Sequence, residues 1–198
     1  MFSKEIKMNE ESNLSIFKKI QGGGYILYSR HGETIDELES NPDLNNCATQ
    51  RNLSEHGKEQ AKQIGNIFRQ QKIPIQYPIL TSPYCRTKDT GKIAFGEENI
   101  EVNNDLANIH YLKQEDLDTE KQKVKENLMK ILETVPSQNL NKVIICHNIS
   151  FDNSYNGLRY MDTVVLKPMG QRRGYTFIDL ISLEQFIEWS NESKTEHR

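Results

Sequence analysis

The chain alternates between short, continuous apolar runs and longer segments whose apolar residues recur every three or four positions. The runs at residues 25–28 and 143–146 are short and rich in β-branched and aromatic residues, which is typical of buried strands. Further strands are predicted at 79–80, 163–166 and 175–181. The run at 143–146 is expected in a central position, because a strand covered on both faces is apolar throughout.

Helical spacing of apolar residues predicts the helices of the chain. Long helices are expected at 55–71, at 83–95 and from 119 to about 135, and shorter ones at 13–21 and 183–189. Strands that alternate with helices predict an α/β fold, here a three-layer α/β/α sandwich with a mostly parallel central sheet.

A single domain is expected over residues 13–198, after a polar tail at 1–12, because no linker rich in Pro, Gly or Ser divides the chain. Residues 33–52 form a polar stretch after the first strand. Loops of this length are usually functional or disordered. Ser82 is expected to cap the helix that follows it, with Pro83 at the first helical position.

Chemically versatile residues follow the two most apolar runs. Arg30 and His31 come just after the first run, and His147 and Asn148 directly follow the second. In open α/β sheets, ligands bind beyond the carboxyl ends of the strands. The sequence therefore predicts a functional site at this edge of the sheet.

Composition limits the classes of partner. The chain has 25 Lys and Arg against 28 Asp and Glu, a net charge of −3, so it has no basic excess to neutralise nucleic-acid phosphates. No apolar run approaches the roughly 18 residues of a membrane-spanning helix, and the N-terminal stretch lacks the apolar core of a secretory signal. We expect a cytoplasmic protein that binds neither nucleic acid nor membranes.

The three cysteines, Cys47, Cys85 and Cys146, are widely spaced and form no CxxC metal motif. An odd number cannot pair completely within one chain. In a cytoplasmic protein, the simplest interpretation is that all three are reduced thiols.

Four segments resemble motifs of the histidine phosphatase (phosphoglycerate-mutase-like) superfamily, in the same order along the chain. Residues 30–33, Arg-His-Gly-Glu, resemble its RHG motif, and residues 53–57, Leu-Ser-Glu-His-Gly, resemble its L-[ST]-x-x-G stretch. Residues 82–87, Ser-Pro-Tyr-Cys-Arg-Thr, resemble its S-P-x-x-R-[AT] segment. Residues 147–148, His-Asn, resemble the segment of its second histidine. The resemblance extends over about residues 25–181, most of the chain.

These residues suit phosphoryl transfer. A neutral imidazole is a competent nucleophile near physiological pH, and attack on phosphorus gives a phosphohistidine. Arg30 and Arg86 each offer a planar, permanently charged fork for phosphate oxygens, and His147 adds a further donor. Two arginines and a protonated histidine could offset a phosphoryl dianion without a metal ion. The resemblance implies His31 as the nucleophile, Arg30, Arg86 and His147 as phosphate-binding residues, and no metal or cofactor.

Other polar residues have simpler expected roles. Three further arginines could also contact the substrate, but a solvated surface position is the preferred interpretation for each, namely Arg51, Arg172 and Arg173. His56 and His110 are interpreted in the same way, and Ser82 as a helix cap, because no GxSxG elbow surrounds it.

The chain departs from the superfamily pattern at Asn108. Many superfamily members place a glutamate in this stretch, which protonates the leaving oxygen, and an asparagine cannot act as an acid. Several other residues could supply the proton, namely Asp105, His110, Glu115, Asp116 and Asp152. The lack of an acid would matter least for good leaving groups, as in acyl phosphates, phosphoramidates and aryl phosphates.

Together these observations predict a metal-independent phosphatase of the histidine acid phosphatase type. Its substrate would be a phosphorylated small molecule or a phosphoprotein, hydrolysed through a phosphohistidine on His31. A phosphoglycerate-mutase-like phosphotransferase is one alternative, although residues 34–37 do not reproduce the longer mutase pattern. A phospho-ligand binding or regulatory protein with low turnover is the other alternative, since Asn108 replaces the expected acid.

Overall fold

The computed structural model describes residues 16–37, 39–109, 112, 118–149 and 157–195. The predicted tail at 1–12 lies outside these residues, as does the beginning of the helix predicted at 13–21, whose described part, 16–22, is helical. No helix among the described residues is both long enough and apolar enough to cross a membrane.

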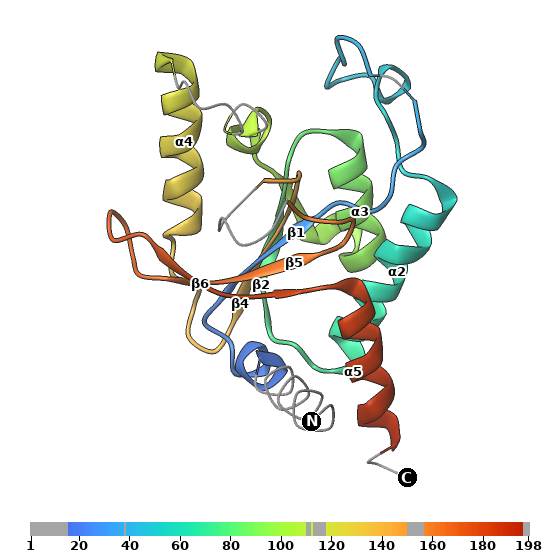
Figure 1. Ribbon diagram of the computed structural model, residues 1–198, viewed down its shortest axis with the longest axis vertical. Coiled ribbons are helices and arrows are strands. Elements are labelled where there is room, and N and C mark those ends of the chain that lie inside the picture. The colour runs from blue at the N-terminus through green and yellow to red at the C-terminus, as the bar shows by residue number, and fades with distance from the viewer. Residues whose placement is uncertain (1–15, 38, 110–111, 113–117, 150–156, 196–198) are drawn as a thin grey trace, which may run out of the picture.

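The described strands form a six-stranded sheet in the order β3-β2-β4-β1-β5-β6 (Figure 1). They are β1 Ile26–Arg30, β2 Ile75–Thr81, β3 Ile100–Val102, β4 Asn141–Cys146, β5 Thr163–Pro168 and β6 Tyr175–Ile181. Strands β3, β2, β4 and β1 pair in parallel, whereas β5 and β6 are joined by antiparallel pairing. The sheet is therefore mixed, with the parallel majority that the sequence predicted.

Helices cover both faces of the sheet. They are α2 Glu55–Gln70, α3 Cys85–Phe95, α4 Thr119–Leu132 and α5 Leu183–Thr195, with 3₁₀ turns η1 Cys47–Thr49, η2 Glu97–Asn99 and η3 Asn104–Leu106. Helices α2, α3 and α5 lie on one face and α4 on the other (Figure 1). The predicted three-layer α/β/α sandwich is confirmed.

The apolar runs of the central strands, residues 26–28 in β1 and 143–146 in β4, are buried on both faces of the sheet. In β1, Leu27 packs into the core beneath α2, α3 and α5, whereas Ile26 and Tyr28 pack into the core beneath α4. All three are fully buried. Parallel pairing with β4 then brings the carboxyl ends of β1 and β4 together, with Arg30 opposite Cys146. Arg30-His31 and His147 therefore meet at one edge of the sheet.

Several elements differ from the prediction, and α5 extends to Thr195 rather than ending at residue 189. Strand β2 continues through Pro78, where the pairing with β4 shifts register, so the missing N–H of proline interrupts no regular ladder. Strand β3 was not predicted, because only three residues pair at the sheet edge. Helix α3 begins at Cys85 rather than Pro83, with Tyr84 as its N-cap residue.

The glycines of two motifs allow a close backbone contact. A Cβ atom on Gly57, near the start of α2, would lie 2.0 Å from the carbonyl oxygen of Glu33, and a Cβ on Gly32 would lie 2.6 Å from the carbonyl oxygen of Gly57. Neither residue can carry a side chain without displacement of the backbone. These two glycines thus fix α2 against the turn that follows His31.

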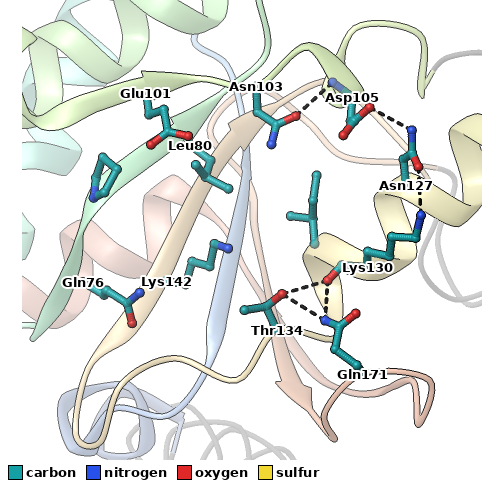
Figure 2. A pocket seen from close by; sticks show the side chains of 12 residues that line it. Gln76, Leu80, Glu101, Asn103, Asp105, Asn127, Lys130, Thr134, Lys142 and Gln171 are labelled. Carbon is teal, nitrogen blue, oxygen red and sulfur yellow. Dashed lines mark hydrogen bonds between the residues drawn. The ribbon is translucent and has the colours of Figure 1, made fainter.

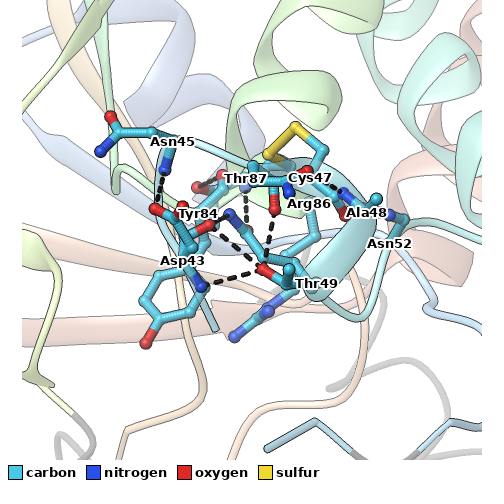
Figure 3. Close-up of a disulfide and its surroundings, with 12 residues drawn as sticks. Asp43, Asn45, Cys47, Ala48, Thr49, Asn52, Tyr84, Arg86 and Thr87 are labelled. Carbon is cyan, nitrogen blue, oxygen red and sulfur yellow. Dashed lines mark hydrogen bonds between the residues drawn. A yellow bond between two sulfur atoms is a disulfide. The ribbon is translucent and has the colours of Figure 1, made fainter. Parts of the chain in front are cut away.

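A disulfide joins Cys47, in the loop after β1, to Cys85, the first residue of α3 (Figure 3). The prediction of three reduced thiols is therefore wrong for this pair, whereas Cys146 is free and buried. The sequence separation of 38 residues concealed the contact, because only the folded loop brings the two Cα atoms within 5.7 Å. Burial raises the pKa of the Cys146 thiol to about 12, which makes it unreactive.

Candidate active site

The backbone at the end of β1 is held by its neighbours. The amide of His31 donates to the carbonyl of Cys146 on β4, and the amide of Arg30 donates to the carbonyl of Asp162. The amide of Gly32 donates to the Thr90 hydroxyl, which itself donates to the carbonyl of Arg86 on α3. The first motif is thereby connected directly to the helix that carries the second arginine.

The His31 imidazole is buried, at 3% exposure, and its orientation is fixed by one hydrogen bond. Its Nδ1 lies 2.7 Å from the Gly32 carbonyl oxygen, which can only accept, so Nδ1 carries the proton. In the neutral ring the lone pair then resides on Nε2. Burial lowers the pKa of His31 to about 3, and the nearby Arg86, Arg30 and Arg51 act in the same direction. The ring is thus a neutral base with an available Nε2.

The Arg30 guanidinium is positioned by the segment that precedes β5. Its Nη1 donates to the Leu158 carbonyl at 2.6 Å, and its Cζ lies 3.9 Å from the centroid of the Tyr160 ring. The stacked ring fixes the plane of the guanidinium, and desolvation by burial lowers the pKa of Arg30. The charge is retained because an arginine cannot be deprotonated in a protein.

Arg86 is the second residue of α3 and is also buried, at 7% exposure. Its Cζ lies 4.3 Å from the centroid of the Tyr84 ring, and its Nη1 donates to the carboxylate of Glu39 at 2.9 Å. Glu39 belongs to the long loop after β1. The loop is attached at the same place by the side chain of Gln50, which accepts the amide N–H of Cys85.

His147 follows β4 and contacts the motifs at residues 30–33 and 82–87. Its ring centroid lies 5.6 Å from that of His31 and 4.9 Å from that of Tyr84. Its Nε2 lies 2.9 Å from the hydroxyl oxygen of Ser82. The sequence predicted that Ser82 caps α3, and this is wrong, because Tyr84 is the N-cap residue. The Ser82 hydroxyl instead positions the second histidine, His147.

The four predicted side chains line one cavity of about 360 Å³. Its lining residues are Arg30, His31, Glu39, Pro42, Arg51, Tyr84, Arg86, His147 and Asn148. The interpretation of Arg51 as a surface residue is therefore wrong, because the loop after β1 folds back over the strand ends. Arg172 and Arg173 are exposed elsewhere, as is His56.

The charge of the cavity favours an anion. Three guanidinium groups and one carboxylate leave two net positive charges on these side chains. Each of the three arginines also has a buried Nε–H without a hydrogen-bond partner, among the described residues. Buried donors of this kind are costly unless a partner satisfies them. A phosphate-sized anion offers enough oxygen acceptors to do so.

The candidate acids from the sequence do not lie at this cavity, as far as they are described. Asp105 accepts a hydrogen bond from Asn127 and lines a separate cavity of about 530 Å³ between β2, β4 and α4 (Figure 2). Among the described residues that line that cavity, there is no arginine or histidine. Asn108 is exposed and does not line the arginine-rich cavity. The remaining candidates lie outside the described residues, namely His110, Glu115, Asp116 and Asp152.

Glu39 is a carboxylate that lines the cavity, and it was not among the candidate acids predicted from the sequence. The loop at 33–52 was expected to be functional or disordered, but nothing in its composition distinguishes Glu39 from the other acidic residues there. Only the fold of the loop brings this side chain to Arg86.

The sequence model of the histidine phosphatase superfamily (branch 1) matches residues 26–143, more than half of the chain. The chain belongs to this superfamily. The match includes the first histidine and all three arginines of the cavity. No curated protein matches the chain in sequence.

Solved structures of other proteins share the fold. A candidate alpha-ribazole-5'-P phosphatase from Escherichia coli K-12 is 15% identical, with a TM-score of 0.54 over 81% of this chain and 98% of the other. A candidate phosphohistidine phosphatase SixA from Agrobacterium tumefaciens is 15% identical, with a TM-score of 0.50 over 80% of this chain and 98% of the other. At these identities, the likeness is one of fold alone.

Proposed function

We propose that this superfamily member is a metal-independent phosphatase that hydrolyses a phosphorylated substrate through a phosphohistidine on His31. The observation that carries the proposal is the cavity itself. It combines a buried neutral imidazole whose Nε2 holds the lone pair with three arginines that have unsatisfied donors. A nucleophile and fixed positive charges around one anion-sized space are what phosphoryl transfer requires.

Each side chain has a separate task in this reaction. Nε2 of His31 attacks phosphorus, and the bond to the leaving oxygen breaks as the N–P bond forms. Arg30 and Arg86 hold phosphoryl oxygens, with His147 as a further donor, and stabilise the charge of the transition state. Arg51 adds a third cation at the loop side of the cavity. Water then attacks the phosphohistidine, which releases phosphate and restores His31.

The substrate class remains broad. The compared structures include a candidate phosphohistidine phosphatase and a candidate phosphatase of a small phosphorylated molecule, so both a phosphoprotein and a small phosphomonoester fit the proposal. The cytoplasmic location also stays a prediction. Disulfides are rare in reducing compartments, so the Cys47–Cys85 disulfide does not support it.

The proposal is tested by hydrolysis of p-nitrophenyl phosphate in the presence of EDTA, for the wild type and His31→Ala. We expect EDTA-resistant turnover that the substitution abolishes. Denatured samples from a rapid quench should contain a phosphohistidine in the wild type only. Phosphate binding without turnover would instead support the regulatory alternative, and a requirement for a metal ion would contradict the mechanism.

A further inference from the structure

The carboxylate of Glu39 lies at the cavity in which a phosphorylated substrate would bind. It lines the same cavity as the His31 ring, and its side chain is only 17% exposed. Among the described residues that line the cavity, no other carboxylate is present. Expulsion of an alkoxide from phosphorus without protonation is slow, and a positioned acid accelerates such steps by about 10²–10⁴-fold.

The contacts of Glu39 are specific. One carboxylate oxygen, Oε1, accepts from Nη1 of Arg86 at 2.9 Å and from the backbone amide of Arg51 at 3.0 Å. The carboxyl group therefore shares a guanidinium with the site at which a phosphoryl oxygen would bind. The Arg86 guanidinium is planar and has several N–H donors. A phosphoryl oxygen bound to one of these donors would lie beside the Glu39 carboxyl group, which is bound to another.

Substrate binding itself favours the protonated form of this carboxyl. A phosphoryl dianion beside a carboxylate places two like charges at one guanidinium, and a proton on the carboxyl removes that repulsion. The same proton provides an O–H donor next to the substrate oxygens.

The loop that carries Glu39 is held against α3. The Cys47–Cys85 disulfide joins the loop to the residue directly before Arg86, and the Gln50 side chain accepts the Cys85 amide N–H at 2.8 Å. Glu39 and Arg86 are therefore positioned by the same attachment. A proton donor requires such positioning, because transfer occurs only at hydrogen-bond distance.

We propose that Glu39 protonates the leaving group, in place of the acid that is missing at Asn108; this inference rests on the proposed phosphatase function. As the lone pair of His31 Nε2 forms the N–P bond, the P–O bond breaks and its electron pair passes to the leaving oxygen, which takes the proton of Glu39. Water then attacks phosphorus, the N–P electron pair returns to His31, and the carboxylate of Glu39 accepts the proton of the water.

The test compares leaving groups in the first turnover, measured by rapid quench with p-nitrophenyl phosphate and with glycerol phosphate. For Glu39→Gln, we expect the first turnover with the alkyl phosphate to slow by about 10²-fold or more, and that with the nitrophenyl ester to stay within about tenfold of the wild type. Nitrophenolate leaves without protonation, so retained activity on this ester also shows that the variant is folded. Glu37→Gln is the matched control, because it makes the same change on an exposed residue of the same loop.

Two further variants make each outcome decisive. Glu39→Asp keeps an acid, so its rate with glycerol phosphate should exceed that of Glu39→Gln, and it carries the comparison if the glutamine variant does not fold. Equal loss on both substrates, no loss on either, or faster turnover on both would overturn the proton-donor role. The His31→Ala variant distinguishes failure of the Glu39 proposal from failure of the proposed phosphatase function. If the first turnover survives in His31→Ala, the phosphohistidine intermediate on which both proposals depend is refuted.

Discussion

Acid should destabilise this protein through His31. The folded chain keeps the imidazole neutral because it is buried among arginines, with its pKa lowered to about 3, whereas the same side chain in an unfolded chain titrates near 6.5. Between these two values the unfolded state binds a proton that the folded state does not. The free energy of unfolding therefore falls as the pH falls from about 6.5 towards 3, and this contribution is constant above about pH 7.5.

The magnitude follows from the two pKa values. At pH 5, protonation of an unfolded histidine with a pKa of 6.5 stabilises the unfolded state by about 2 kcal/mol, whereas a folded histidine with a pKa of about 3 gains almost nothing. At pH 7.5, both forms are neutral and the contribution is close to zero. His31 alone should thus remove about 2 kcal/mol of stability between these pH values.

The measurement is urea unfolding of the wild type and His31→Gln at pH 7.5 and at pH 5, in buffers free of phosphate so that no anion binds the cavity. The wild type should lose about 2 kcal/mol more than the variant between the two pH values. His56→Gln is the control, because His56 is exposed and its replacement should leave the pH dependence of the wild type unchanged. The reasoning is refuted if His31→Gln shows the same pH dependence as the wild type.

Three further predictions concern the supports of the site. Gly57→Ala should lower the free energy of unfolding by about 3 kcal/mol, because the added Cβ would meet the Glu33 carbonyl oxygen. Gly22→Ala is the control: the space around its Cβ is open, so it should cost less than about 1 kcal/mol in the same denaturation assay. Equal losses in the two variants would contradict the close contact at Gly57. Cys47→Ser should lower stability by up to about 4 kcal/mol, as should reductant on the wild type, and a wild type insensitive to reductant would argue against the disulfide. His147→Ala should keep the circular dichroism spectrum but lose most phosphatase activity, and unchanged kinetics would remove it from the site.

Local patterns were sufficient for the central part of the molecule. The apolar runs of β1 and β4 predicted two buried strands because burial on both faces leaves no polar positions. The residues directly after them, Arg30-His31 and His147, were expected at one sheet edge, and parallel pairing brings them there. These inferences needed only the hydrophobic pattern of consecutive residues and the rule that parallel strands end at the same edge of a sheet.

Features that depend on long-range contacts were not accessible in this way. Glu39 and Arg51 reach the cavity, and Cys47 reaches Cys85, because the polar loop after β1 folds back over α3. Ser82 contacts His147 across 65 positions of sequence instead of capping its own helix. Polar loop residues carry no periodicity that reports their partners. Their contacts arise from the path of the whole chain, so the linear order of residues could not reveal which carboxylate and which additional cation complete the site.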